Sequence, residues 1–261
     1  MCVFVVFTFL ALLLYGFQTR AITAMPLVWL VLFVFLNLAH KKIDLSWIKN
    51  VLTFAVFGLG VLFEMHLLGF HNLKLGTTLF SINGLPETSY FNFDKTLSGL
   101  ILLYFYENKM VFSQTLFLKT FLITLMAIFV TIGLAAYPLH LVAFDFKIHQ
   151  TIFTWSLRNF FAVALCEELL FRGFLLESLV PIFSVRFNTK LAKILGLILT
   201  SVLFGLFYYR SGSTMILLAS IAGFFYGWVY LKTNHVFYSA LAHFTLNLVH
   251  FVFFTYPCLA L

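Results

Sequence analysis

The sequence predicts an all-α polytopic membrane protein, a helical bundle with about eight or nine transmembrane helices. Of its 261 residues, 62% are hydrophobic and only 10% are charged, whereas a soluble domain is nearer half apolar and a quarter charged. The mean hydropathy is +1.04. The apolar runs are continuous, without the alternation of an outer-membrane barrel. A water-soluble fold is therefore excluded, because a chain of this length cannot bury so much Phe, Leu and Val.

The apolar runs also place the helices along the chain, at roughly 20 residues for each span. The fourth run is short, so it spans, re-enters or lies at the interface, and the sixth is long enough to be broken. The longest loop, about 71–96, contains INGLPETSYFNFDK, whose Gly, Pro, Asn and Asp predict turns. The predicted helices lie at about 2–18, 22–39, 51–70, 97–106, 116–136, 150–183, 191–209, 214–231 and 236–256.

The basic residues indicate topology rather than nucleic-acid binding. The net charge is +7, but Lys and Arg lie at helix ends, where they face lipid headgroups. The first 20 residues lack a basic start and a small-residue cleavage site, so they predict a retained helix. The richer side holds Lys41, Lys42, Lys49, Lys109, Lys119, Arg186, Lys190, Lys193 and Lys232. The other side holds Arg20, Lys74, Lys95, Lys147, Arg158 and Arg210. This bias favours a cytoplasmic N-terminus. We expect a multi-pass protein of the bacterial inner membrane.

Charges inside the sixth helix are the first indication of function. The stretch FAVALCEELLFRGFLLESLV contains Glu167, Glu168 and Arg172 within apolar sequence. Glu168 and Arg172 are four residues apart, the spacing of an ion pair on one helix face. Glu167 lies about 100° round the helix, without a built-in counter-charge. Because ionisable residues inside a membrane mark functional sites by default, Glu167 is predicted to accept and donate protons. For Glu168 with Arg172, a purely structural ion pair is equally open.

The last helix presents a polar stripe. Asn247 and His250 follow His243 by four and seven residues, so the three side chains share one helix face. Three polar groups on one face predict a polar cavity. His243 and Asn247 can aim N–H donors at a developing oxyanion. A zinc site made by Glu167, His243 and His250 is an alternative, but no HExxH pairing supports it. We therefore expect no resident metal or other cofactor. Tyr208, next to another tyrosine at a helix end, is by composition typical of an interfacial aromatic belt.

These motifs resemble the CPBP family of intramembrane proteases, which includes CAAX proteases and bacteriocin-processing enzymes and is also called the ABI or Rce1-type family. The family motif EExxxR is matched by EELLFR at 167–172, and HxxxN by HFTLN at 243–247. The FxxxH motif is matched only in part by FGLFY at 204–208, where Tyr208 replaces the histidine. The resemblance covers roughly residues 150–256, which we take as the protease core. Residues 1–149 form N-terminal transmembrane helices.

The resemblance implies a metal-free mechanism with defined roles. Glu167 acts as general base on a water, which the residue of the second motif helps to place. His243 and Asn247 bind the oxyanion, and Arg172 neutralises and orients Glu168. The stretches FNFDK and HFVFFTYP resemble the sorting-type, myxosortase-like branch, to which removal of C-terminal membrane-anchoring tails from exported proteins is ascribed.

The expected function is thus a glutamate-dependent intramembrane endopeptidase acting on a membrane-embedded or lipid-anchored protein. Tyr208 leaves three outcomes open. Its hydroxyl holds the water, or His250 substitutes for the missing histidine, or the protein is a catalytically inactive scaffold. A proton-coupled transporter is a further alternative, although the inverted repeat typical of transporters is not visible.

Overall fold

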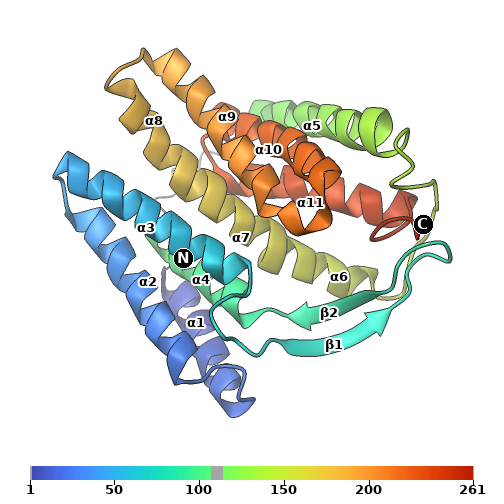
Figure 1. Cartoon of the computed structure of the whole chain (residues 1–261), viewed down its shortest axis with the longest axis horizontal. Coiled ribbons are helices and arrows are strands. Elements are labelled where there is room, and N and C mark those ends of the chain that lie inside the picture. Colours follow the sequence, from blue (N-terminus) through green and yellow to red (C-terminus); the bar gives the residue numbers. More distant parts are fainter. Residues whose placement is uncertain (1, 107–113, 261) are drawn as a thin grey trace.

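The computed structural model describes residues 2–106 and 114–260; Lys109 of the charge count lies outside them. Within this part of the chain, nine helical segments form a bundle with a small hairpin at one end (Figure 1). The predicted helical membrane fold is confirmed, and six of the segments are long and apolar enough to cross a bilayer. Eight segments are α1 (Cys2–Gln18), α2 (Ala24–Lys42), α3 (Ser46–Glu64), α4 (Phe93–Phe105), α5 (Gln114–Ile128) continued by the π-helical η1 (Phe129–Ala136), α9 (Thr189–Phe207), α10 (Ser213–Thr233) and α11 (Val236–Phe253).

The remaining segment is one unbroken helix through the middle of the bundle (Figure 1). It consists of α6 (Ile152–Asn159), η2 (Phe160–Ala164), α7 (Leu165–Glu168), η3 (Leu169–Leu176) and α8 (Glu177–Ser184). The stretches η2 and η3 are π-helical. This conformation is rare in proteins, and where it occurs it often lies at a functional site. They flank the short α7, which ends with the two acids of the first motif. The predicted long helix is therefore present, and it is not broken.

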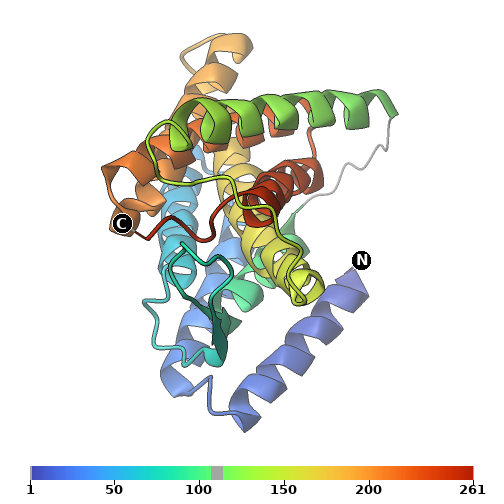
Figure 2. The same cartoon turned by 90° about the vertical axis from the view of Figure 1, so that its right-hand side faces the viewer.

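Helices pack against both sides of this central segment. Figure 1 shows α1–α4 on one side and α5 with α9–α11 on the other. After a quarter turn, α5 lies across the top of the molecule and α1 lies at its lower edge (Figure 2). Buried residues from both parts of the chain join one hydrophobic core, among them Phe33, Phe63, Phe171 and Phe204. Residues 1–149 and 150–256 therefore share a core.

The loop predicted at 71–96 contains a β-hairpin. Strands β1 (Leu73–Thr78) and β2 (Glu87–Phe91) pair antiparallel, with Leu73 opposite Phe91 and Thr78 opposite Glu87. The strands are short and mostly polar, so their period-2 signal is weak beside the turn residues between them. Helix α4 begins directly after β2, earlier than the predicted residue 97.

Small residues bring α9, α10 and the central helix together. A Cβ added to Gly205 would lie 1.9 Å from Ser220 Oγ, and one added to Gly227 would lie 2.5 Å from Leu197 Cδ1. A Cβ at Gly205 would also lie 2.4 Å from the Ile216 carbonyl oxygen, so glycine there allows the close approach of α9 to α10.

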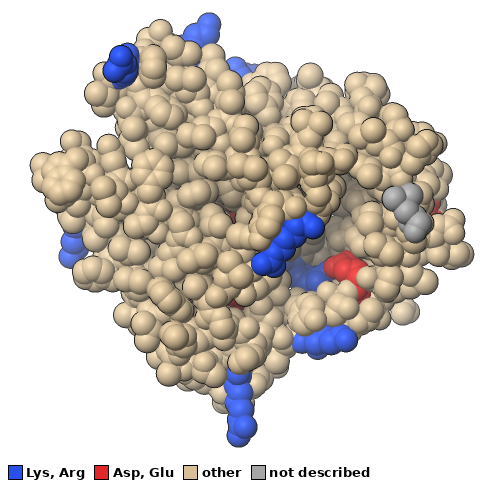
Figure 3. Space-filling model, viewed as in Figure 1, with Lys and Arg blue, Asp and Glu red and all other residues tan. Residues whose placement is uncertain are grey.

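The outer surface is largely uncharged, as expected for a protein that faces lipid. Figure 3 shows scattered basic side chains on one face, with acidic and basic groups gathered at one hollow. Lys95, counted above among loop charges, is only 8% exposed. Its inclusion in the topology count was wrong, because it lies inside the bundle.

Candidate active site

Glu168 forms an ion pair with Arg172, as the spacing predicts. Arg172 Nη1 donates to Glu168 Oε1 over 3.0 Å, and both side chains are completely buried. Arg172 Nη2 also donates to the Gly223 carbonyl of α10 over 2.6 Å. Its guanidinium lies over the Phe204 ring at 4.6 Å. These contacts fix the charge of Arg172 between three helices.

Glu168 also binds two residues of α11. Ser239 Oγ donates to Glu168 Oε2 over 2.6 Å, and His243 Nδ1 lies 3.1 Å from Glu168 Oε1. Because a carboxylate accepts, His243 carries its proton on Nδ1 in this pair. The ring stacks on Tyr226, with 4.6 Å between centroids and an 11° interplanar angle. Glu168 therefore orients His243 and leaves its Nε2 for another partner.

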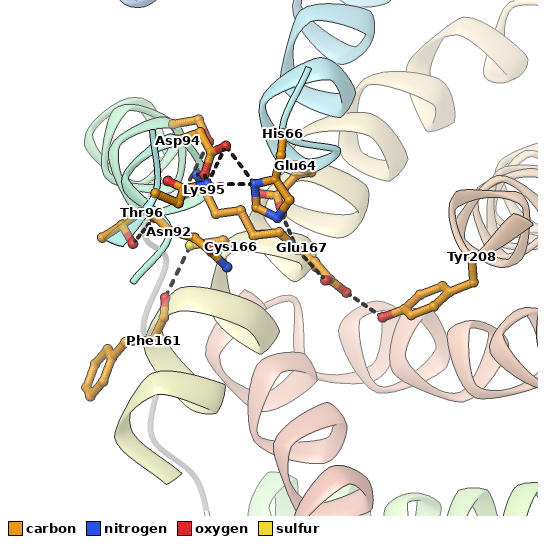
Figure 4. Close-up of polar contacts among 12 residues, drawn as sticks. Glu64, His66, Asn92, Asp94, Lys95, Thr96, Phe161, Cys166, Glu167 and Tyr208 are labelled. Atoms are coloured by element: carbon orange, nitrogen blue, oxygen red, sulfur yellow. Dashed lines mark hydrogen bonds and ion pairs between the residues drawn. The ribbon is translucent and has the colours of Figure 1, made fainter. Parts of the chain in front are cut away.

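Glu167 has a counter-charge that local sequence does not reveal. Lys95 Nζ of α4 lies 3.3 Å from Glu167 Oε1 and 3.3 Å from Glu64 Oε2 of α3. The prediction that Glu167 is unpaired is therefore wrong. Figure 4 shows Lys95 reaching from α4 between the two acids. All three side chains are buried, so the ammonium compensates carboxylates held away from water.

Hydrogen bonds to the first turn of α4 hold Lys95 in position to contact Glu64 and Glu167. Asp94, which is fully buried, accepts a hydrogen bond from His66 Nδ1 over 2.6 Å and from Asn72 Nδ2 over 3.1 Å. Asn72 Oδ1 in turn accepts from the Phe93 N–H over 2.9 Å. The segment that links α3 to β1 is thereby tied to the first turn of α4 (Figure 4).

Tyr208 lies inside the bundle, at the end of α9. Its hydroxyl donates to Glu167 Oε2 over 3.1 Å (Figure 4). The aromatic-belt interpretation is wrong for Tyr208, although its neighbour Tyr209 is exposed. The residue that replaces the histidine of the second motif thus contacts the first glutamate directly.

A cavity of about 170 Å³ brings the polar stripe of α11 together with Tyr208. Its walls include His243, Asn247 and His250, as the shared helix face predicts, together with Tyr208 and Tyr226. Glu167 and Glu168 reach this cavity through their partners, since Tyr208 binds one acid and His243 binds the other.

Two stripe residues have partners that fix them. Asn247 Nδ2 donates to Asn159 Oδ1 of α6 over 3.2 Å. His250 Nε2 lies 3.1 Å from the carbonyl oxygen of Thr255. His250 is thus held by the segment after α11, whereas Tyr208 is the motif-two residue placed against Glu167.

The zinc alternative required Glu167, His243 and His250 to converge as ligands. In the part of the chain that the structure describes, no three His, Cys, Asp or Glu side chains are grouped to hold a metal ion. Those three residues therefore do not form a ligand set.

Sequence reasoning missed several residues of this site. Glu64 had a usable signal, because it is an acid at the end of an apolar helix and the rule applied to Glu167 applies to it too. Ser239 had one as well, since it precedes His243 by one helical turn. Lys95 and Asn159 had none, because their partners lie 72 and 88 residues away.

The fold and the buried acids define a multi-pass membrane protein with a polar site inside the bundle. Residues 149–249 match the family model of the type II CAAX prenyl endopeptidases, Rce1-like. The family predicted from the motifs is therefore confirmed for this segment, and it is a family of proteases. No curated protein and no solved structure matches the chain. Glu64 and Lys95 lie outside the matched segment.

Proposed function

We propose that the protein is an intramembrane endopeptidase that uses Glu167 as general base to hydrolyse a peptide bond near the membrane. One observation carries the proposal. The Tyr208 hydroxyl is hydrogen-bonded to Glu167 and borders the cavity that His243 and Asn247 also line. Tyr208, which is hydrogen-bonded to the base, and two groups suited to an oxyanion therefore border one space.

In this mechanism, a water in the cavity donates a hydrogen bond to the Tyr208 oxygen. As the water oxygen bonds to the substrate carbonyl carbon, its proton passes to Tyr208 and the Tyr208 proton passes to Glu167. The tetrahedral intermediate then collapses with cleavage of the C–N bond, and the proton returns from Glu167 through Tyr208 to the leaving amine. The side chains end in their starting states, and a carboxylic acid and an amine are released.

Two residues of α11 stabilise the oxyanion. With its Nδ1 proton donated to Glu168, His243 offers a second N–H only when its ring is protonated at Nε2 as well. The Glu168 carboxylate compensates that positive charge. Asn247 supplies amide protons to the same cavity, and Asn159 holds its orientation. Donors placed before the reaction are the largest single contribution in many enzymes that pass through an oxyanion.

The position of the cavity supports one class of substrate. His250 and the segment after α11 line one end of it, on the side of the bundle that carries the hairpin (Figure 1). The charge bias of the loops favours a non-cytoplasmic position for this side. A membrane-anchored exported protein, cut close to the bilayer to remove a C-terminal anchor, fits this placement.

A second function has one observation in its favour. The Tyr208 hydroxyl is hydrogen-bonded to one carboxylate oxygen of Glu167. In a catalytically inactive scaffold, this contact would keep water away from the acid. A cleavage assay of the wild type separates the two functions. The scaffold predicts no cleavage by the wild type, whereas the endopeptidase cleaves with Tyr208 in place.

The test uses the full chain reconstituted in liposomes with membrane-anchored peptides that carry varied juxtamembrane sequences. New peptide termini are detected by mass spectrometry. We expect cleavage by the wild type and a loss of about 10²–10⁴-fold in Glu167→Gln, the usual contribution of a general base. Glu87→Gln, a change in the hairpin, is the matched control and should cleave normally. Cleavage that persists in Glu167→Gln would refute the role of Glu167.

A further inference from the structure

The segment after α11 joins two other parts of the chain through isolated β-bridges. Phe254 pairs with Phe144 and Leu259 pairs with Gly84, both antiparallel. We call residues 257–260 the tail strand. On one side, Leu259 N–H donates to the Leu141 carbonyl over 3.0 Å. On the other, Leu85 N–H donates to the Cys258 carbonyl over 3.3 Å, and Ala260 N–H donates to the Asn83 carbonyl over 2.9 Å.

The tail strand borders the candidate active site. Pro257 and Cys258 line the cavity together with Tyr208, His243 and Asn247. Leu141, which binds the strand through its carbonyl, lines the same cavity. A peptide segment bonded through its backbone therefore already lies beside the groups that we propose for peptide hydrolysis.

The chain is anchored just before the tail strand and held more lightly along it. Thr255 is 3% exposed, and its Oγ1 accepts from the Ala143 N–H over 3.0 Å. The Tyr256 ring packs in an aromatic cluster with Phe251 and Trp155. The tail strand instead has half-buried or exposed side chains, and among the contacts given above it is held by backbone bonds. Displacing it would break these backbone bonds and would leave the contacts of Thr255 and Tyr256 intact.

We propose that the tail strand occupies the binding groove for the substrate, so that the protein is autoinhibited until a substrate strand displaces it. If the tail strand leaves, Leu141 C=O, Asn83 C=O and Leu85 N–H lose their partners. An extended peptide restores these bonds by strand addition on both sides, a common mode of peptide recognition. The ligand is thus an extended peptide with a small or apolar residue facing the cavity, where Pro257 and Cys258 now lie. This inference rests on the proposed function, since it names the substrate's path to that site.

A single substitution can lock the tail strand in place. The pairing of Gly84 with Leu259 puts Leu85 opposite Cys258, and opposite residues of antiparallel strands have Cα atoms about 4.5–5.5 Å apart, which suits a disulfide. We expect oxidised Leu85→Cys to cleave anchored peptides at least about tenfold more slowly, since a tail that cannot leave lowers the competent fraction in proportion. Reduction should restore the rate. Leu85→Cys combined with Cys258→Ser is the control and should not respond to oxidation. Equal rates before and after reduction would overturn the inference.

A second measurement does not depend on cleavage. The probe is a synthetic peptide copying residues 254–260 with Cys258→Ser, added to the Glu167→Gln protein. We expect it to raise the rate at which a maleimide labels Cys258, because the displaced tail strand exposes its thiol. The same peptide N-methylated at the amides corresponding to Leu259 and Ala260 cannot donate to Leu141 and Asn83 and should have no effect.

The two measurements separate the inference from the proposed function. Faster labelling of Cys258, without cleavage by any variant, would refute the endopeptidase function and support the proposed substrate groove. Cleavage that is indifferent to the disulfide, with labelling unchanged by either peptide, would refute the groove and keep the endopeptidase.

Discussion

Glu167 and Glu168 are neighbours in the chain, and both are buried, yet their surroundings differ. Glu168 is satisfied by Arg172, Ser239 and His243, all within the segment that matches the protease family. Glu167 is held by Tyr208 from that segment and by Lys95 from α4. One acid therefore belongs to a fixed network, and the other is shared between the two parts of the chain.

In the proposed mechanism, this difference gives the two acids different tasks. Glu168 has charged or hydroxyl partners on both oxygens, so its task is to hold Arg172 and His243 in place. Glu167 accepts from the Tyr208 hydroxyl, which also borders the cavity, so we propose that its task is to exchange protons. The N-terminal helices take part in that task, because Lys95 sets the charge beside Glu167.

The largest expected effect concerns the fixed network. Replacing Arg172 with Met leaves Glu168 buried without its cation, and loss of one partner of a buried pair lowers the free energy of unfolding by about 3–5 kcal/mol. Thermal unfolding in detergent measures this loss. Arg158→Met, which breaks the partly exposed pair with Glu87, should lower it by only about 0–1 kcal/mol. Equal losses in the two variants would contradict a special role for Arg172.

The next effect concerns the shared acid. Lys95→Met leaves Glu64 and Glu167 without their common cation, so the rate of peptide cleavage should fall about 100-fold, or about 2.7 kcal/mol in the barrier. Lys95→Arg keeps the charge and should recover most of the rate, while Lys74→Met on the exposed hairpin should leave it unchanged. A folded Lys95→Met protein that cleaves at the wild-type rate would remove Lys95 from the site.

The smallest effect concerns a hydroxyl of the fixed network. Ser239→Ala removes the donor to Glu168 Oε2, so the free energy of unfolding should fall by about 1.5 kcal/mol, as for other hydrogen bonds to charged groups. Thr245→Ala on the same helix removes only a bond to the helix's own backbone and should have little effect. Denaturant titration of both variants compares them, and a larger loss in Thr245→Ala would reverse the ranking.

The same contrast explains what the sequence could predict. Contacts within one helix follow from spacing, so Glu168 with Arg172 and the stripe of His243, Asn247 and His250 were predicted correctly. Contacts between helices that are distant in the sequence do not follow from spacing. For this reason Lys95 was placed in a loop, and Glu167 was described as unpaired. The helical fold follows from composition, whereas the hairpin was missed because its strands are short and mostly polar. The contact of Tyr208 with Glu167 could not be predicted, because it depends on how α9 packs against the central helix.

The central claim is that Glu167 acts on water through Tyr208, and the single-turnover cleavage rate of Tyr208→Phe tests it most directly. This variant keeps the ring and removes the hydroxyl that bonds Glu167. The account predicts a rate as low as that of Glu167→Gln, on the order of 10²–10⁴-fold below the wild type. A Tyr208→Phe protein that cleaves at the wild-type rate would contradict it.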